Sequence, residues 1–329
     1  MHMVCFRGLL PCDQSWRFGM KRLNDPGDLC DALGIPFSPE QLSAICAPLE
    51  PQVIVAGAGT GKTTVMAARV VWLVGTGQVR AEQVLGLTFT RKAAAELDGR
   101  IRHALERSDL VSRDETEGGE MVFTYDAFAA RLVREHGLRL GIEADARLLS
   151  GASRFRVAAR AVAEHSRPLE HLSWLSPRQL PERVLALDAA LGSHLATPEQ
   201  IREFSRRAKA RFEEAPLWRG SPTKAVLEAQ TAIDERLELL ELVETYRELK
   251  RRLGLVEFAD QQAQAVELAR SVPAVGAMLR QRFHVVLLDE YQDTSSVQAI
   301  LLRALFSGSD PASGRGFPVT AVGDPNQAI

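Results

Sequence analysis

Residues 56–63 constrain the fold of this chain more than any other segment, because their order suits a narrow set of structures. A short apolar run, residues 53–55, precedes them, and residues 65–73 have the apolar spacing of a helix. A strand, a glycine-rich loop and a helix form the context in which a loop binds phosphate. Gly59 and Gly61 allow the tight turn that points backbone N–H groups at phosphate oxygens. The alternative, a glycine-rich turn that caps an ordinary helix, is the weaker interpretation.

This phosphate loop supplies two kinds of ligand. Lys62 can reach the β- and γ-phosphates of a nucleotide, and the Thr63 hydroxyl can ligate Mg²⁺. The strict pattern has glycine where Ala56 stands. The predicted nucleotide-binding residues are Gln41, Ala56, Gly57, Ala58, Gly59, Thr60, Gly61, Lys62, Thr63 and Thr64, of which Gln41 rests on a resemblance given below.

An acidic pair follows a second apolar run. Residues 285–288 are typical of a strand buried on both faces, and Asp289 and Glu290 follow at its carboxyl end. Ligands of open α/β sheets bind beyond the carboxyl ends of the strands. There Asp289 can hold Mg²⁺, and Glu290 can orient and deprotonate an attacking water. Alone, such a pair is usually a solvated strand end, but the phosphate loop favours the catalytic interpretation.

Amino-acid composition limits the possible binding partners of the chain and indicates its redox compartment. The formal net charge of −2 excludes a globally basic nucleic-acid binder, so any DNA affinity must come from a local patch. Cys5, Cys12, Cys30 and Cys46 lack the paired spacing of a metal site, and we expect free thiols in a reducing cytoplasm. No apolar run approaches the ~20 residues that span a bilayer, so we expect no membrane contact.

Strand and helix patterns alternate along most of the chain. Apolar runs predict strands near residues 53–55, 84–89, 121–124, 285–288 and 319–322, with helices between most of them. This alternation predicts an α/β fold with a mostly parallel sheet. The interval from about residue 126 to residue 282 has helical patterns and little strand signal, which predicts an all-helical insertion.

Five blocks of the sequence resemble the UvrD/Rep/PcrA branch of superfamily 1 DNA helicases. They are residues 37–41, 56–63, 87–97, 288–294 and 322–329. Ala56 fits, because members of this branch commonly have alanine there. The resemblance implies an N-terminal extension at residues 1–36 and a RecA-like P-loop domain in two parts, 37–126 and 283–329. The helical insertion domain would occupy residues 127–282.

The resemblance also implies roles for single residues. Gln41 would read the adenine edge of ATP, and Gln327 would sense the γ-phosphate and couple it to DNA. With Lys62, Asp289 and Glu290, Gln327 completes the expected catalytic set. The expected contacts to single-stranded DNA are Thr88, Phe89, Thr90, Lys92, Thr124 and Tyr125. Lys92 could instead be a solvated residue in the first turn of a helix, and Phe89 and Tyr125 could be core aromatic residues.

The chain departs from this family at two positions. Asp126 stands where the family usually has histidine, and an ionised carboxylate would repel phosphate, so we interpret Asp126 as a helix cap. Thr64 stands where several relatives carry arginine. Residues 124–141 are similar to motor subunits of actinobacterial helicase–nuclease complexes, particularly the AdnB type, which implies a helicase–nuclease partner subunit.

Two charged segments of the expected insertion each have two interpretations. A basic stripe on one predicted helix could hold duplex DNA, or it could be a solvated face balanced by Glu203, Glu213 and Glu214. The basic stripe comprises Arg202, Arg206, Arg207, Lys209 and Arg211. Residues 256–260 resemble an acidic-aromatic block of the family, although structurally they need only begin a helix.

These observations lead to one main hypothesis. The resemblance implies the ATP-binding half of an ATP-dependent 3′-to-5′ DNA helicase of repair or recombination, with ATP and Mg²⁺ as cofactors and single-stranded and duplex DNA as partners. Because the sequence ends two residues after Gln327, we expect it to bind Mg·ATP and single-stranded DNA weakly without unwinding. The alternative is a non-motor nucleotide- or DNA-binding module, or a decayed gene product, that scaffolds a partner. An unrelated phosphate-loop ATPase would not explain residues 88–97.

Overall fold

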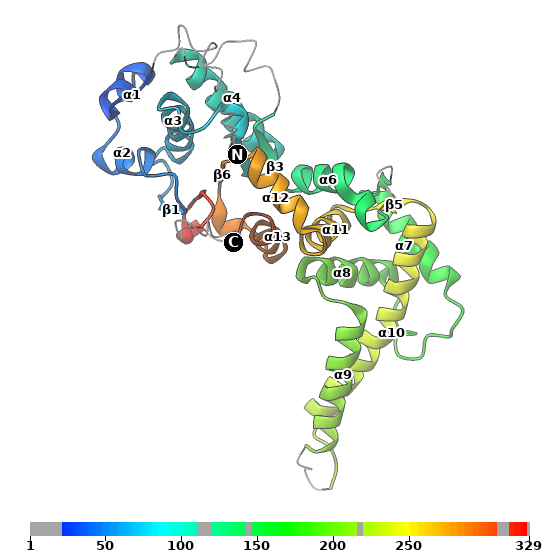
Figure 1. Ribbon diagram of the computed structural model, residues 1–329. Coiled ribbons are helices and arrows are strands. Elements are labelled where there is room, and N and C mark those ends of the chain that lie inside the picture. Colours follow the sequence, from blue (N-terminus) through cyan, green and yellow to red (C-terminus); the bar gives the residue numbers. More distant parts are fainter. Residues whose placement is uncertain are drawn as a thin grey trace, which may run out of the picture. The chain divides into compact units, whose positions relative to one another are not determined.

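The computed structural model describes residues 22–108, 110, 120–142, 146–215, 220–307 and 316–327 (Figure 1). The chain separates into two compact units. The sheet unit consists of the described residues within Met1–Val122, Phe283–Tyr291 and Pro318–Ala328. The helical unit consists of those within Phe123–Arg282 and Gln292–Phe317. The domain boundaries expected at residues 36, 126 and 282 stay a prediction.

A five-stranded sheet with the strand order β1-β7-β6-β2-β3 organises the fold. Its strands are β1 (Gln52–Val55), β2 (Val84–Thr88), β3 (Val122–Thr124), β6 (Val285–Leu288) and β7 (Val319–Gly323). The pairs β1–β7, β7–β6 and β6–β2 are parallel, which confirms the predicted α/β fold. Every residue of β2 and β6 is buried, as their continuous apolar sequences indicate. Because the strands are parallel, the loops that follow β1, β2, β6 and β7 leave the same edge of the sheet.

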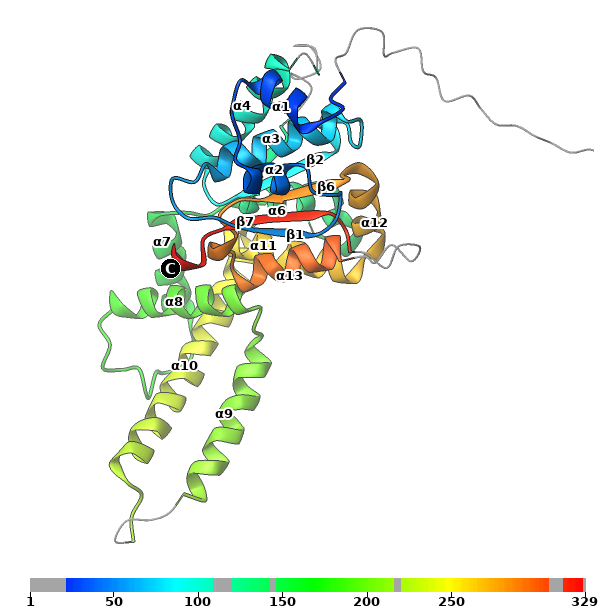
Figure 2. The ribbon, with the colours of Figure 1, turned by 90° about the vertical axis from the view of Figure 1, so that its left-hand side faces the viewer.

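Four helices cover one face of the sheet in the sheet unit (Figure 2). They are α1 (Pro26–Leu33), α2 (Pro39–Ile45), α3 (Lys62–Gly75) and α4 (Arg91–Arg107). The sheet unit also contains the short 3₁₀ helices η1 (Ala81–Gln83) and η4 (Pro325–Gln327). Helix α3 carries much of the core, because Met66, Val70 and Leu73 are fully buried. The phosphate-loop segment therefore leads into the most deeply packed helix of this unit.

The helical unit contains longer helices and its own hydrophobic core around Leu240, Val243 and Tyr246. Its elements are α6 (Tyr125–His136), η2 (Gly137–Leu140), α7 (Ala152–Glu164), α8 (Gln179–His194), α9 (Pro198–Glu213), α10 (Lys224–Arg252), α11 (Phe258–Ser271), α12 (Pro273–Arg282) and α13 (Ser296–Phe306). A 3₁₀ turn, η3 (Tyr291–Asp293), precedes α13. Helices α9 and α10 lie side by side as an elongated pair (Figures 1 and 2).

The insertion is not entirely helical. Strands β4 (Arg147–Leu148) and β5 (Leu255–Val256) form a parallel two-stranded ladder. Backbone hydrogen bonds from Arg147 N to Gly254 O and from Leu149 N to Val256 O, both 2.8 Å long, extend it. The expectation of an all-helical segment is wrong on this point, because a two-residue strand is too short to show the alternation by which strands are recognised.

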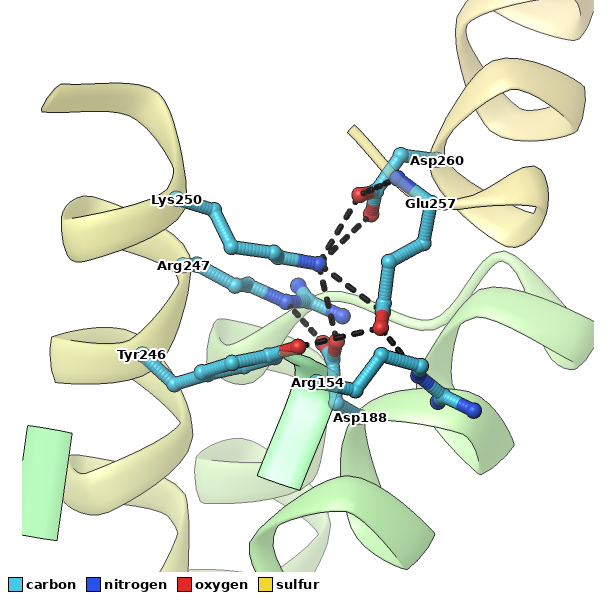
Figure 3. Close-up of polar contacts among 7 residues, drawn as sticks. All are labelled: Arg154, Asp188, Tyr246, Arg247, Lys250, Glu257 and Asp260. Atoms are coloured by element: carbon cyan, nitrogen blue, oxygen red, sulfur yellow. Dashed lines mark hydrogen bonds and ion pairs between the residues drawn. The ribbon is translucent and has the colours of Figure 1, made fainter. Parts of the chain in front are cut away.

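A buried ionic cluster joins four helices of the helical unit (Figure 3). Lys250 Nζ lies 3.1 Å from Asp188 Oδ2, 3.1 Å from Glu257 Oε2 and 2.8 Å from Asp260 Oδ2. Arg154, Tyr246 and Arg247 also hydrogen-bond to these carboxylates. The three carboxylates are close enough to hold a metal ion, but the Lys250 ammonium already supplies the cation among them. Residues 256–260 thus cap α11 and also anchor this cluster.

Two further expectations concern cysteines and membranes. Cys30 and Cys46 are free thiols, whereas Cys5 and Cys12 lie outside the described residues. In the part of the chain that the structure describes, no helix is both long enough and apolar enough to cross a membrane.

Candidate nucleotide site

The loop between β1 and α3 adopts a conformation that requires glycine. Gly59 and Gly61 have φ angles of 75° and 82°, in the left-handed region that other residues rarely adopt. A Cβ atom at Gly59 would meet nothing within 4 Å, so the backbone angle rather than lack of space calls for glycine there. The Thr60 hydroxyl donates to the Gly57 carbonyl over 2.8 Å and closes the turn.

The N-terminus of α3 differs from its neighbours. Asp25, Ser38 and Thr90 cap α1, α2 and α4 by accepting hydrogen bonds from backbone N–H groups of the first turn. Helix α3 begins after Gly61 and has no side-chain cap. Its first N–H groups and the positive end of its dipole therefore face the loop, which is the arrangement of an anion site.

Lys62, Asp289 and Glu290 come together beside this helix end. Lys62 Nζ lies 3.0 Å from Glu290 Oε2, although the two residues are 228 positions apart in the sequence. Glu290 has a φ of 48°, and its backbone N–H donates to Asp289 Oδ1 over 3.1 Å. Burial, and next the negative charge of Glu290, raise the pKa of Asp289. A cation at Asp289 would relieve this unfavourable burial of charge.

Gln41 and Gln327 contact the same region from two other elements. The Gln41 side chain donates from Nε2 to the Thr60 carbonyl over 3.1 Å, while its Oε1 accepts from Ser38 N in a capping box. Gln327 Nε2 donates to Asp324 Oδ2 over 2.6 Å. A Cβ at Gly57 would lie 3.9 Å from that same Asp324 oxygen, so Asp324, which directly precedes η4, lies beside the phosphate loop. The structure thus brings Gln41, Lys62, Asp289, Glu290 and Gln327 together.

Arg69 is a residue of this site region that the sequence patterns do not reveal. It lies fully buried in α3, where Nε donates to Thr320 Oγ1 of β7 over 3.1 Å. Its other nitrogens donate to the backbone carbonyls of Ala44 and Ile45 at the end of α2, and of Ala47 and Pro48 just after it. Arg69 therefore ties α2, which carries Gln41, to α3 and to β7. An arginine among apolar helix residues was the only available signal.

The predicted DNA-contacting residues of the sheet unit differ in accessibility. Thr88 is fully buried at the end of β2, and among the described residues its hydroxyl has no hydrogen-bond partner. Phe89 is 40% exposed. Thr90 and Lys92 are also exposed, and Thr90 caps α4 by accepting from Ala93 N. Phe89, Thr90 and Lys92 thus form an accessible segment beyond the carboxyl end of β2.

The remaining two predicted DNA contacts belong to the helical unit. Thr124 accepts a hydrogen bond from Ala127 N and is the N-cap of α6. Tyr125 is buried, and its hydroxyl lies 3.3 Å from Thr294 Oγ1, which favours the core interpretation of this aromatic ring. The interpretation of Asp126 as the cap is wrong, because Thr124 takes that position and Asp126 accepts from Gln262 of α11.

The basic stripe of α9 is paired with acidic residues. Arg206 and Arg207 both contact Glu203 on the same helix, while Lys209 contacts Asp234 of α10. Arg202 contacts Glu244, also on α10. The Arg202 and Lys209 pairs link α9 to α10, and the four pairs together favour the solvated-face interpretation over a duplex-binding one.

A parallel sheet with a glycine-rich loop, an uncapped helix and an acidic pair at its carboxyl edge defines the class of RecA-like P-loop domains. Over residues 37–329 the sequence matches the UvrD/REP helicase N-terminal domain. The chain belongs to this family.

Several curated helicases are similar to most of the chain. DNA helicase II of Haemophilus influenzae is 26% identical over 310 residues, which cover 93% of this chain and 35% of the relative. DNA helicase II of Escherichia coli (strain K12) is 28% identical over 290 residues, or 88% of this chain and 34% of the relative. ATP-dependent DNA helicase UvrD2 of Mycobacterium tuberculosis is 30% identical over 302 residues, or 91% and 38%. The chain thus spans about a third of the length of these relatives.

Proposed function

We propose that the sheet unit binds Mg·ATP and single-stranded DNA, and that the chain provides the ATP-binding part of an ATP-dependent 3′-to-5′ DNA helicase of repair or recombination. The observation that carries the proposal is the uncapped start of α3 with Lys62 held beside Glu290. Polarity, pathway, the AdnB-type identity of this subunit and a helicase–nuclease partner subunit rest on the family resemblance alone.

The residues of the site fit ATP and Mg²⁺ chemically. The loop N–H groups and Lys62 are suited to phosphate oxygens, and Gln41 lies against the loop where it would select adenine. Thr63 and Asp289 offer the oxygen ligands that Mg²⁺ prefers. When bound, Mg²⁺ would neutralise negative charge on the transferred phosphoryl group.

Glu290 would have two roles, first as the ion-pair partner of Lys62 and then as the general base. Its carboxylate now pairs with Lys62, and an incoming γ-phosphate would compete for the same ammonium. Once Lys62 turns to phosphate, Glu290 is available to orient water and accept its proton. Gln327, which Asp324 holds near Gly57, would register whether the γ-phosphate is present. Phe89, Thr90 and Lys92 are the exposed residues for the DNA strand.

Titration of the chain with a fluorescent ATP analogue and Mg²⁺ tests the nucleotide site. Lys62→Ala should weaken binding by at least about 10-fold, because a charge-assisted hydrogen bond contributes roughly 1.5–3 kcal/mol. Glu290→Gln should bind as tightly as the unmodified chain or more tightly, since it releases Lys62 from its ion pair. Any ATP turnover stimulated by single-stranded DNA should fall by about 10² or more in Glu290→Gln.

Lys224→Ala, an exposed change on α10 of the helical unit, serves as the control and should leave nucleotide affinity unchanged. Full affinity in Lys62→Ala would contradict the proposed site. If the unmodified chain binds nucleotide tightly but shows no ATP turnover that Glu290→Gln could remove, the non-motor module is favoured instead.

A further inference from the structure

A pocket of about 380 Å³ opens on the helical unit between α7, the β4–β5 ladder and the end of α10. Its floor is apolar and consists of Leu148, Leu149, Val157, Leu253 and Leu255. Leu149 is buried, whereas Leu148 remains 45% exposed. Figure 1 shows α7, β5 and the end of α10 converging at this place. The backbone bonds of β4 to Gly254 and Val256 fix the floor in position.

Every charged side chain that lines this pocket is an arginine: Arg147, Arg156 and Arg160. Arg156 and Arg160 are one turn apart on α7, so their guanidinium groups repeat along the helix with a rise of about 6 Å. Arg156 donates to the Ser153 hydroxyl over 3.1 Å, and Arg160 pairs with Glu164. Glu164 also accepts from Arg252 at the end of α10, so this one carboxylate is shared by Arg160 of the pocket and Arg252 outside it.

The arginines of the pocket differ from the basic stripe of α9 in how many of them are paired with carboxylates. Four cations of that stripe contact Glu203, Asp234 or Glu244 on α9 and α10. In the pocket, Arg160 pairs with Glu164, but Arg147 and Arg156 form no ion pair within the described part of the chain, and they line a concave surface with an exposed leucine. A patch of unbalanced positive charge in a chain of net charge −2 is where a polyanion should bind.

The shape of the pocket selects among polyanions. A flexible strand can bend one phosphate and its sugar into a concave site of this volume, whereas a duplex presents its phosphates on a rigid convex surface. Guanidinium groups bind phosphate oxygens in a bidentate manner, and the apolar floor suits the carbon face of a sugar or base. An acidic peptide offers carboxylates that arginine also binds in a bidentate manner, but it has no sugar or base to pack on the apolar floor.

We propose that this arginine-lined pocket binds the phosphate backbone of single-stranded nucleic acid. The inference rests on the proposed function in taking DNA as the ligand, and it adds a contact to the strand that lies outside the sheet unit. Arg147 and Arg156 hold phosphates, and Leu148 packs against the sugar.

Fluorescence anisotropy of the full chain with a labelled 20-nucleotide oligo-dT, measured from 50 to 200 mM NaCl, tests this site. Arg147→Ala combined with Arg156→Ala should weaken binding several-fold at low salt. The slope of log affinity against log salt should fall by about 1.4, because each phosphate contact on a single strand contributes roughly 0.7. Arg206→Ala combined with Arg207→Ala removes two exposed charges from α9 and is the matched control, which should change both quantities little.

Circular dichroism establishes that both double variants fold. Equal losses in the pocket and control variants, or no loss in the pocket variant, would overturn the assignment. If polyglutamate, added at the same concentration of negative charges as the oligo-dT, displaces the oligo-dT, the pocket does not prefer nucleic acid to an acidic peptide and the assignment of its ligand is overturned. If the unmodified chain binds oligo-dT and Lys92→Ala weakens it while the pocket variant does not, the proposed function stands and only the pocket fails. Failure of the unmodified chain to bind oligo-dT overturns both.

Discussion

Arg69 shows how one residue can join the parts of the nucleotide site. Its guanidinium is fully buried and donates to Thr320 Oγ1 and to backbone carbonyls at the end of α2 and just after it. Burial lowers the pKa of Arg69 to about 10, so the side chain stays charged at neutral pH. The planar fork matches several carbonyls at once, which lysine cannot do. Arg69 thereby positions α2, with Gln41, against the helix that follows the phosphate loop.

Arg69→Met should destabilise the sheet unit by at least about 3 kcal/mol, because each buried carbonyl left without a donor costs roughly 1–3 kcal/mol. The measurement is the urea midpoint of unfolding. Arg69→Lys keeps the positive charge but has fewer hydrogen-bond donors. Its urea midpoint should lie between those of the unmodified chain and Arg69→Met. A methionine variant that unfolds at the same urea concentration as the unmodified chain would refute this role.

At the scale of single elements, the start of α3 combines two features. Several helices begin with a side-chain cap, as Ser38, Thr197 and Ser295 provide for α2, α9 and α13, whereas α7 and α8 also begin without one. Helix α3 lacks such a cap and faces the phosphate loop instead. The motif predicts this difference, because glycine at the N-cap position offers no side-chain acceptor.

The junction of α8, α10 and α11 depends on Lys250. Its ammonium is buried among Asp188, Glu257 and Asp260, which raise its pKa against the opposing effect of burial, so Lys250 stays charged. Lys250→Met should destabilise the helical unit by about 3–5 kcal/mol, because it leaves buried carboxylates without their cation. The measurement is the rate of backbone amide hydrogen exchange in α8, α10 and α11, which should rise as this stability is lost.

Lys224→Met provides the comparison on the same helix. Lys224 pairs with Glu228 at an exposed position, and its replacement should cost no more than about 1 kcal/mol. Equal exchange rates in the Lys250→Met and Lys224→Met proteins would show that the buried cluster does not stabilise the junction.

At the scale of the whole molecule, the two compact units should respond differently to nucleotide. The phosphate loop, the acidic pair and Gln41 all lie in the sheet unit. A ligand present at 100 times its dissociation constant stabilises the state that binds it by about 2.7 kcal/mol. Saturating Mg·ATP should therefore slow hydrogen exchange in α2, α3 and β6 and leave α7–α10 unchanged. Protection confined to the helical unit would place the nucleotide site elsewhere.

The sequence by itself determined the parallel α/β fold, the phosphate loop and the positions of the five main strands, because these depend on local patterns. Apolar runs define buried strands, and Gly59 and Gly61 define a turn. The family blocks likewise identified membership before any distance was known, although the roles of Gln41, Lys92 and Gln327 stay predictions.

Only the tertiary structure decided which distant residues meet. Lys62 pairs with Glu290 across 228 positions, and Lys250 gathers Asp188 and Glu257 from other elements. The structure also showed that Thr124 rather than Asp126 caps α6, that the basic stripe of α9 is paired, and that arginines line a pocket beside β4. A sequence pattern reports the neighbours of a residue along the chain, whereas charge balance and burial depend on neighbours in space, which the fold alone supplies.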